Sequence, residues 1–391
     1  MTAESATRFA ALEAQAARIM ETFNAAGYEP VAPAILQPAG LFLDQIGEAV
    51  RSRTYVFTDN DGEELCLRPD LTIPVCRLYL ERHPEANVEA RYCYNGPAFR
   101  YQPGGNDPTR PREFRQAGVE FIGGASAEHA EAEVLALALE ALRVSGLEGF
   151  QIRFGDLGLF AALVAALDIP DRWRERLRHF FWRAQAFRDL LRDMAEPSGS
   201  GIAGNGKLLR KIDPADPEGA QEIVSKHLAR LDIPLFGERT LGEIAERLID
   251  KAADIKEAPL PKKAIDLIEG YLAVDGPPRA ALARIDDLVS AAGIDLNEPL
   301  TQFQHRLNLF AENGVDLATA QFSAEFGRDL EYYTGLVYQV EVPDLGRGGQ
   351  VAGGGRYDSL LTGIGASARV PAVGAAIHTE RLLAMVRGEG T

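Results

Sequence analysis

Two strand-rich segments separated by a long helical region constrain the fold of this chain more than any other feature of its sequence. Short runs of aromatic and β-branched residues, which favour strands, recur from Tyr55 to Gly123 and again from Ala320 to Ile377. Between these segments, apolar residues mostly follow helical spacing. Because strands and helices do not alternate regularly, this order favours an α+β fold over a doubly wound one. We expect a sheet domain at 1–156 and 314–391 and a helical insertion at 157–313.

The first segment is predicted to be an amphipathic helix that ends at Gly27. Its apolar residues recur at steps of three and four, which places them on one face that we expect to be buried: Phe9, Leu12, Ala16, Ile19 and Phe23. A second helix is predicted at 127–144. Residues 196–206 are almost all turn formers and are predicted to be a flexible loop.

The charge and the cysteines narrow the functional class. A formal net charge of −16 argues against a nucleic acid as the main partner, because phosphate binding needs a basic surface. Cys66, Cys76 and Cys93 form no metal-binding pattern, and we expect them to be buried thiols in a reducing compartment. The sequence predicts neither a signal peptide nor a membrane-spanning segment. We therefore expect a cytoplasmic protein without a metal or a cofactor.

Polar side chains concentrate on a predicted antiparallel hairpin that covers 99–123. Because strand side chains alternate, Arg100 and Gln102 share one face, and Gln116, Gly118 and Glu120 share another. If both faces point into one cleft, an arginine, two amides and a carboxylate converge there, and Gly118 leaves room against the backbone. The alternative interpretation is a solvent-facing polar stripe on a half-exposed sheet.

Three further stretches carry residues suited to a binding site, each with an ordinary structural alternative. Asp70 and Thr72 follow a strand and begin a helix, where either could simply cap it. Two adjacent tyrosines at 332–333 could form the wall of a pocket, and the glycine run at 353–355 permits either close backbone approach or a sharp turn. Arg381 follows a strand of small residues and could be an ordinary solvated charge.

Taken together and in order, these stretches resemble class II aminoacyl-tRNA synthetases, and specifically histidyl-tRNA synthetase. Tyr28–Pro33 resembles motif 1, Phe99–Gly123 resembles motif 2 and Pro371–Leu382 resembles motif 3. Arg328–Thr334 and Gly353–Asp358 resemble the two histidine-specific signatures. The resemblance implies an antiparallel sheet flanked by helices and a self-dimer formed through the motif 1 region.

The resemblance also implies a binding site for histidine. The residues that match the family's histidine pocket are Asp70, Thr72, Gln116, Glu120, Arg328, Tyr332, Tyr333 and Tyr357. In this interpretation Asp70 and Gln116 hold the α-ammonium group, Arg328 lies near the carboxylate and Glu120 accepts a hydrogen bond from the imidazole. Such buried charges are favourable only when ligand and pocket neutralise each other.

The nucleotide side departs from the synthetase pattern. Motif 2 of the synthetases reads Phe-Arg-x-Glu, but Gln102 replaces the glutamate that contacts adenine. His378 stands where motif 3 has a glycine against which adenine lies. The resemblance therefore implies only a vestigial nucleotide site, at Arg100, Gln102, Arg110, His378 and Arg381. Only ten residues follow Arg381, where the synthetases continue into an anticodon-binding domain, so we expect neither that domain nor tRNA binding.

These departures resemble the histidyl-tRNA-synthetase paralogues that partner the short form of ATP phosphoribosyltransferase. The resemblance implies a regulatory subunit without catalytic activity, which forms a hetero-octamer with the catalytic subunit at the first step of histidine biosynthesis. It further implies that the subunit is required for activity and for feedback inhibition by L-histidine. Two alternatives stay open: a truncated aminoacyl transferase that forms histidyl-adenylate for an acceptor other than tRNA, and a scaffold whose pocket is vestigial.

Overall fold

The computed structural model describes residues 5–43, 45, 48–102, 111–124, 126–181, 183–195, 206–230, 240–328, 330–343 and 349–388. The chain folds into two compact units, which we call the sheet unit (1–162, 273–290 and 295–391) and the helical unit (163–272 and 291–294). The predicted insertion at 157–313 is thus divided between the two units. Within the described ranges, no helix has both the length and the apolar character needed to cross a membrane.

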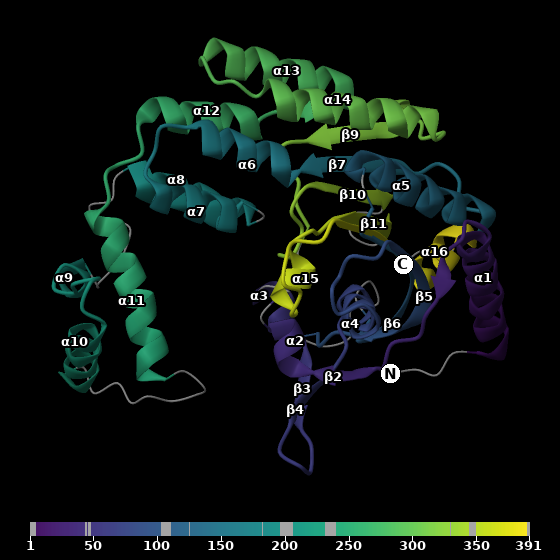
Figure 1. Cartoon of the computed structure of the whole chain (residues 1–391), viewed down its shortest axis with the longest axis horizontal. Coiled ribbons are helices and arrows are strands. Elements are labelled where there is room, and N and C mark those ends of the chain that lie inside the picture. Colours follow the sequence, from purple (N-terminus) through teal and green to yellow (C-terminus); the bar gives the residue numbers. More distant parts are fainter. Residues whose placement is uncertain are drawn as a thin grey trace. The chain divides into compact units, whose positions relative to one another are not determined.

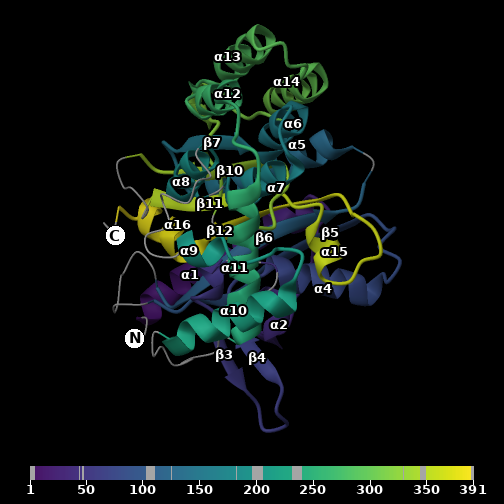
Figure 2. The same ribbon diagram turned by 90° about the vertical axis from the view of Figure 1, so that its left-hand side faces the viewer.

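A large sheet forms the centre of the sheet unit. In the part of the chain that the structure describes, nine strands follow the order β1-β5-β6-β12-β11-β10-β7-β9-β8, and only β1/β5 and β7/β9 pair in parallel (Figures 1 and 2). This mostly antiparallel pairing confirms the predicted α+β class. The strands are β1 Glu29–Pro30, β5 Ala90–Phe99, β6 Glu113–Ile122, β7 Gln151–Asp156, β8 Asp275–Gly276, β9 Ala320–Ser323, β10 Leu336–Glu341, β11 Gln350–Arg356 and β12 Ala372–His378.

Helices cover one face of this sheet. The long helix α5 (Ala127–Val144) packs on β6, β11 and β12, and it contacts α1 (Ala6–Ala25) and α14 (Asn297–Glu312). Ser5 caps α1 by accepting from the Arg8 backbone N–H at 3.2 Å. The predicted apolar face of α1 is buried except for Phe9, which is 53% exposed. The prediction for Phe9 is wrong: this residue near the start of α1 stays exposed although it shares the helical spacing of the buried residues. Further helices of this unit are α13 Pro278–Ala291, η1 Leu317–Thr319 and α16 Thr379–Val386, and α6 (Leu157–Ala166) begins in this unit and ends in the helical unit.

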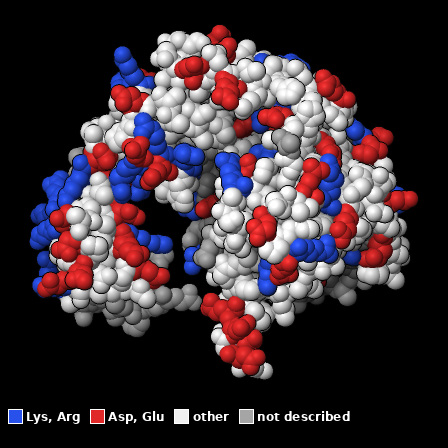
Figure 3. Space-filling view, in the orientation of Figure 1, with Lys and Arg blue, Asp and Glu red and all other residues white. Residues whose placement is uncertain are grey.

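The elements between β1 and β5 supply polar side chains to the other face of the large sheet. A three-stranded sheet of order β2-β4-β3 precedes α4 (Thr72–Arg82). The three cysteines lie in β4, α4 and β5, and all are free and buried, as predicted. At the tip of the β3–β4 hairpin, acidic side chains gather on the surface (Figure 3). The elements are β2 Leu36–Pro38, α2 Ala39–Leu43, α3 Glu48–Arg51, β3 Tyr55–Thr58, β4 Glu64–Leu67 and α15 Leu360–Gly363.

The helical unit has its own apolar packing. Leu209, Ile212, Val224 and Ala245 belong to a buried cluster, and the Trp173 indole N–H donates to the Ala258 carbonyl at 2.7 Å. The predicted loop at 196–206 lies outside the described residues except for Gly206. The helices are α7 Asp171–Phe180, α8 Ala184–Ala195, α9 Gly206–Leu209, α10 Pro217–Arg230, α11 Leu241–Lys256 and α12 Lys262–Leu272.

Candidate functional site

A cavity of about 710 Å³ lies over the middle of the large sheet, on the face away from α5. Its floor is lined by small residues, Gly374, Ala375 and Ala376 of β12 and Gly353 of β11, of which Ala376 pairs with Gly353. Gly118 does not line the cavity, because the Tyr94 hydroxyl occupies the space beside it. Gln339 of β10 pairs with Gly353 and extends over the cavity from the next strand. Short side chains in the centre of the sheet leave the backbone accessible to a ligand. The glycine run at 353–355 thus lies in a strand and not in a sharp turn.

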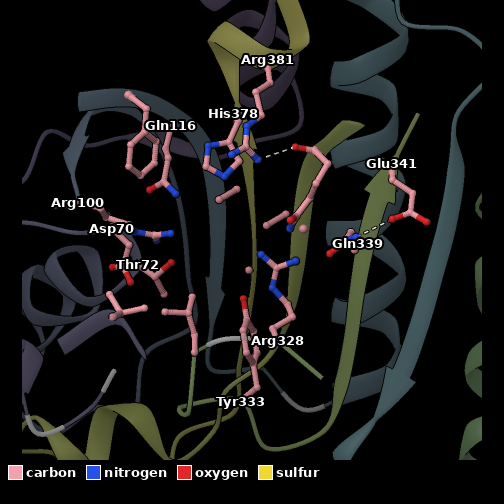
Figure 4. Close-up of a pocket in the computed structure, with 18 of the residues that line it drawn as sticks. Asp70, Thr72, Arg100, Gln116, Arg328, Tyr333, Gln339, Glu341, His378 and Arg381 are labelled. Carbon is pink, nitrogen blue, oxygen red and sulfur yellow. Dashed lines mark hydrogen bonds between the residues drawn. The ribbon is translucent and has the colours of Figure 1, made fainter. Parts of the chain in front are cut away.

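The structure brings most of the predicted residues together around this cavity (Figure 4). Glu120 does not line it, and Arg110 lies outside the described residues. The predicted residues that do line the cavity are Asp70, Thr72, Arg100, Gln102, Gln116, Arg328, Tyr332, Tyr333, Tyr357, His378 and Arg381. Strand β5 ends at Phe99, so Arg100 and Gln102 reach the cavity from the segment after the strand and not from the strand itself.

Three buried polar atoms of the lining side chains have no hydrogen-bond partner among the described residues. They are two acceptors, Asp70 Oδ2 and Gln116 Oε1, and one donor, Arg328 Nε. The other Asp70 oxygen accepts from the Ile73 N–H at 3.3 Å, so this carboxylate both caps α4 and faces the cavity. Asp70 and Gln116 lie on one side and Arg328 faces them across the cavity (Figure 4). Unpaired buried acceptors opposite an unpaired donor are complementary to an ammonium group and a carboxylate.

Aromatic rings form the neighbouring wall. The Tyr332 ring lies 4.8 Å from the Tyr333 ring and 5.7 Å, edge to face, from the Tyr357 ring. The Arg328 guanidinium lies 5.9 Å from the centre of the Tyr333 ring. A Cβ on Gly353 would collide with this guanidinium, so the glycine is what allows Arg328 to lie on the strand. The cavity therefore combines unpaired polar groups of opposite kinds with an aromatic wall.

Glu120 does not line the cavity and instead accepts hydrogen bonds from the hydroxyl groups of two tyrosines. It is fully buried, accepts from the Tyr94 hydroxyl at 3.1 Å and also accepts from the Tyr357 hydroxyl. Its carboxylate occupies the space where a side chain on Gly374 would stand. Tyr357 thus lines the cavity, and Glu120 contacts the Tyr357 hydroxyl without lining the cavity itself.

We expect Glu120→Gln to stabilise the ligand-free protein at alkaline pH. Burial raises the pKa of Glu120 from 4.5 to about 7, against the opposing hydrogen bonds from Tyr357, Thr72 and Tyr94. The folded state therefore holds this proton more tightly than the unfolded state. The resulting stability is complete below pH 4.5 and is lost as the pH rises through about 7, a loss of up to about 3 kcal/mol. Urea unfolding at pH 5 and pH 8 measures it: the advantage of glutamine should grow with pH, and an advantage independent of pH would contradict the prediction.

Three residues at the end of the cavity that the resemblance assigns to a nucleotide pack on one another. The His378 ring packs against the Phe114 ring at 5.1 Å, and the Arg100 guanidinium lies 5.2 Å from the centre of the same ring. Burial, together with the charges of Arg381, Arg100 and Arg328, holds the pKa of His378 well below its usual range, so this imidazole is neutral at pH 7. Arg100 Nε donates to the Pro69 carbonyl at 2.9 Å. The His378 ring thus lies beside the Phe114 ring, at the position where the resemblance places a glycine.

Sequence reasoning missed one side of the cavity. Arg153 of β7 and Gln339 and Glu341 of β10 line it, with Gln339 Nε2 donating to Glu341 at 2.7 Å (Figure 4). The available signal was the alternation of polar residues along 336–341, which places Gln339 and Glu341 on one strand face. Only the pairing of β10 with β11 and β7 shows that this face adjoins the glycine floor.

Known proteins share the fold of this chain. The family model described as histidyl-tRNA synthetase matches residues 5–200 and 236–382. A solved structure from Bacillus halodurans, titled as an ATP phosphoribosyltransferase regulatory subunit/histidyl-tRNA synthetase, has a TM-score of 0.68 at 21% identity and covers 99% of this chain and 82% of that one. A histidyl-tRNA synthetase from Nostoc has a TM-score of 0.61 at 16% identity, covering 97% of this chain and 72% of that one. These similarities confirm the predicted class II aminoacyl-tRNA synthetase-like fold.

Curated relatives are more similar in sequence. A protein from Mesorhizobium japonicum is 34% identical over 97% of this chain and 98% of its own length, and one from Chelativorans is 35% identical over 91% and 92%. Both are named ATP phosphoribosyltransferase regulatory subunit. The chain therefore belongs to the histidyl-tRNA-synthetase-like family of ATP phosphoribosyltransferase regulatory subunits.

Proposed function

We propose that this chain is a non-catalytic subunit of ATP phosphoribosyltransferase that binds free L-histidine in the cavity of the sheet unit. With the short-form catalytic subunit it forms a cytoplasmic hetero-octamer at the first step of histidine biosynthesis. The catalytic subunit needs it for activity, and bound histidine shifts the complex toward a less active state. A coupling of about 1–3 kcal/mol between the two sites is typical of such regulation.

One observation carries this proposal: the unpaired atoms of Asp70, Gln116 and Arg328 line a single cavity beside three tyrosine rings. Free histidine supplies an ammonium donor for Asp70 and Gln116 and a carboxylate acceptor for Arg328. Its imidazole ring would lie against the tyrosine rings. His378 supports the regulatory part of the proposal, because a pocket that keeps the amino-acid end and fills the nucleotide end is suited to sensing histidine and not to activating it.

The proposal is tested with the complex. The chain is co-purified with the short-form catalytic subunit and assayed with ATP and phosphoribosyl pyrophosphate, with and without L-histidine. We expect high activity only when both subunits are present, and inhibition by histidine that requires this chain. A catalytic subunit that is fully active and equally inhibited alone would contradict the proposal.

A truncated aminoacyl transferase is the second candidate, because Arg100, Arg328 and Arg381 all line the cavity as they would around an adenylate. Histidine-dependent exchange of pyrophosphate into ATP separates the two functions. We expect no exchange above background, since His378 packs on Phe114. Exchange at the rate of a synthetase would favour the transferase.

Self-association through the motif 1 region is also a proposal. Four apolar side chains near motif 1 are each 39–50% exposed. They are Ile35 and Leu36, which follow motif 1, and Val56 and Phe57 of strand β3. A second copy of the chain that covers them would remove apolar surface from water. Sedimentation of the full chain should show a dimer, and Phe57→Glu should weaken it.

A further inference from the structure

A group of buried charged side chains lies behind the pocket wall and is not used by the proposed function. We call it the buried charge cluster and define it as Glu131 of α5, Asp156 of β7, Arg306 of α14, and Arg356 and Asp358 at the end of β11. The side chains of Glu131, Asp156 and Arg356 are 0%, 4% and 7% exposed. None of the five lines the cavity.

Glu131 connects two arginines that are far apart in the sequence. One of its oxygens accepts from Arg306 Nε and the other from Arg356 Nε. Arg306 also donates to Asp156 at 2.8 Å, and Arg356 donates to Asp358 at 2.8 Å and to the Ala127 carbonyl at 2.7 Å. Although burial opposes ionisation, the two guanidiniums hold the pKa of Glu131 below its ordinary value. A single ionised carboxylate thus connects α5, α14 and β11.

The cluster holds the backbone on both sides of Tyr357. Arg356 and Asp358 are its neighbours in the chain, and the Tyr357 N–H donates to the Ala372 carbonyl at 2.8 Å. The Ala372 N–H in turn donates to Asp358 Oδ1 at 3.0 Å, the same oxygen that Arg356 contacts. The position of Tyr357 is therefore set by groups on the helix-covered side of the sheet.

The same cluster reaches the other tyrosines through Thr334. The Thr334 N–H donates to the Arg356 carbonyl at 2.8 Å, and the Asp358 N–H donates to Thr334 Oγ1 at 3.1 Å. Thr334 directly follows Tyr333. Fixing Arg356 and Asp358 thus fixes both tyrosine-bearing segments relative to each other.

We propose that Glu131 and Arg306 are positioning residues of the histidine pocket, which hold Arg356 and Asp358 and thereby keep Tyr357 at the pocket wall. The proposal rests on the proposed function, since histidine is the ligand whose ring Tyr357 contacts. Stability alone does not account for the cluster, because buried ion pairs are often no more stabilising than apolar residues of similar volume. Directional hydrogen bonds to a ligand-contacting segment give the charges a geometric role.

The test is a double-mutant cycle in histidine affinity, measured by calorimetry on the full chain. Glu131→Gln keeps the shape of the side chain and should weaken binding about tenfold, as should Tyr357→Ala, which removes the ring at the pocket wall. If Glu131 acts through Tyr357, the double variant should be about as weak as either single variant. With Gln116→Ala, which changes the opposite side of the pocket, the effect of Glu131→Gln should multiply in full.

Controls keep the outcomes distinct. Asp254→Asn removes a carboxylate held by Arg172 and Arg176, both at 2.7 Å, in the helical unit, and should leave histidine affinity unchanged. If Glu131→Gln does not fold, Arg306→Lys, which keeps the charge but loses the fork of donors, takes its place in the cycle. Wild-type protein that does not bind histidine refutes the proposed function. If the wild-type protein binds histidine but the effect of Glu131→Gln on affinity multiplies fully in both cycles, the positioning role alone is overturned. The same holds if neither Glu131→Gln nor Arg306→Lys changes the affinity.

Discussion

Asp70→Asn should abolish histidine binding, weakening the affinity at least about 100-fold. Asp70 is only 3% exposed, and its unpaired oxygen is the acceptor that the α-ammonium group requires. Burial raises the pKa of Asp70, with Arg100 opposing, and a bound ammonium group would favour the ionised form. Asparagine preserves the volume but leaves the ammonium charge without compensation, which typically costs 2–5 kcal/mol. Calorimetry measures the loss, and the complex with the catalytic subunit should stay active while losing inhibition by histidine.

Glu341→Gln is the matched control for this prediction. Its carboxylate also lines the cavity, but it already accepts from Gln339 at 2.7 Å and lies 3.6 Å from Arg153 Nη2. Removing its charge should change histidine affinity by no more than about twofold, because neighbouring protein groups already compensate it. Wild-type affinity in Asp70→Asn would show that the ammonium group is held elsewhere.

His378→Gly should create affinity for adenine nucleotides, with ATP binding at least about tenfold more tightly than to the wild-type protein. The substitution removes the ring that packs on Phe114 and exposes one aromatic face beside Arg100 and Arg381. Stacking of a base on an aromatic side chain contributes about 1–3 kcal/mol. Calorimetry with ATP in the presence of histidine measures the gain.

The control for this gain is His378→Phe, which keeps the position beside Phe114 occupied. It should bind ATP no better than the wild-type protein. If both variants bind ATP equally well, the ring of His378 is not what excludes the nucleotide. If neither variant binds ATP, the missing motif 2 glutamate at Gln102 becomes the stronger explanation.

Local sequence patterns predicted individual elements of the fold well. The helix expected at 127–144 is α5, and the second strand of the hairpin expected at 99–123 is β6, because long periodic segments follow their intrinsic pattern. The expectation that Phe9 is buried was wrong, because periodicity assigns a residue to a helix face but does not show whether another part of the protein covers that face there. The position of Glu120 could not be predicted, since strand alternation gives its face but not the tyrosines that separate it from the cavity.

Contacts between distant segments were beyond reach without the structure. Glu131 and Arg356 lie 225 positions apart, and nothing in the local pattern of either segment indicates that they meet. Gln339 and Glu341 likewise became site residues only when β10 was placed beside the glycine strand. The family resemblance supplied the residues proposed for the histidine pocket, whereas the buried charge cluster beside Tyr357 could be recognised only in the structure.

A crystal structure of the full chain with L-histidine tests the central claim most directly. The account predicts one histidine in the cavity of the sheet unit, with its ammonium group at Asp70 and Gln116, its carboxylate at Arg328 and its ring against Tyr357. Histidine bound elsewhere would contradict it, and so would an empty cavity in crystals grown at a saturating concentration of histidine.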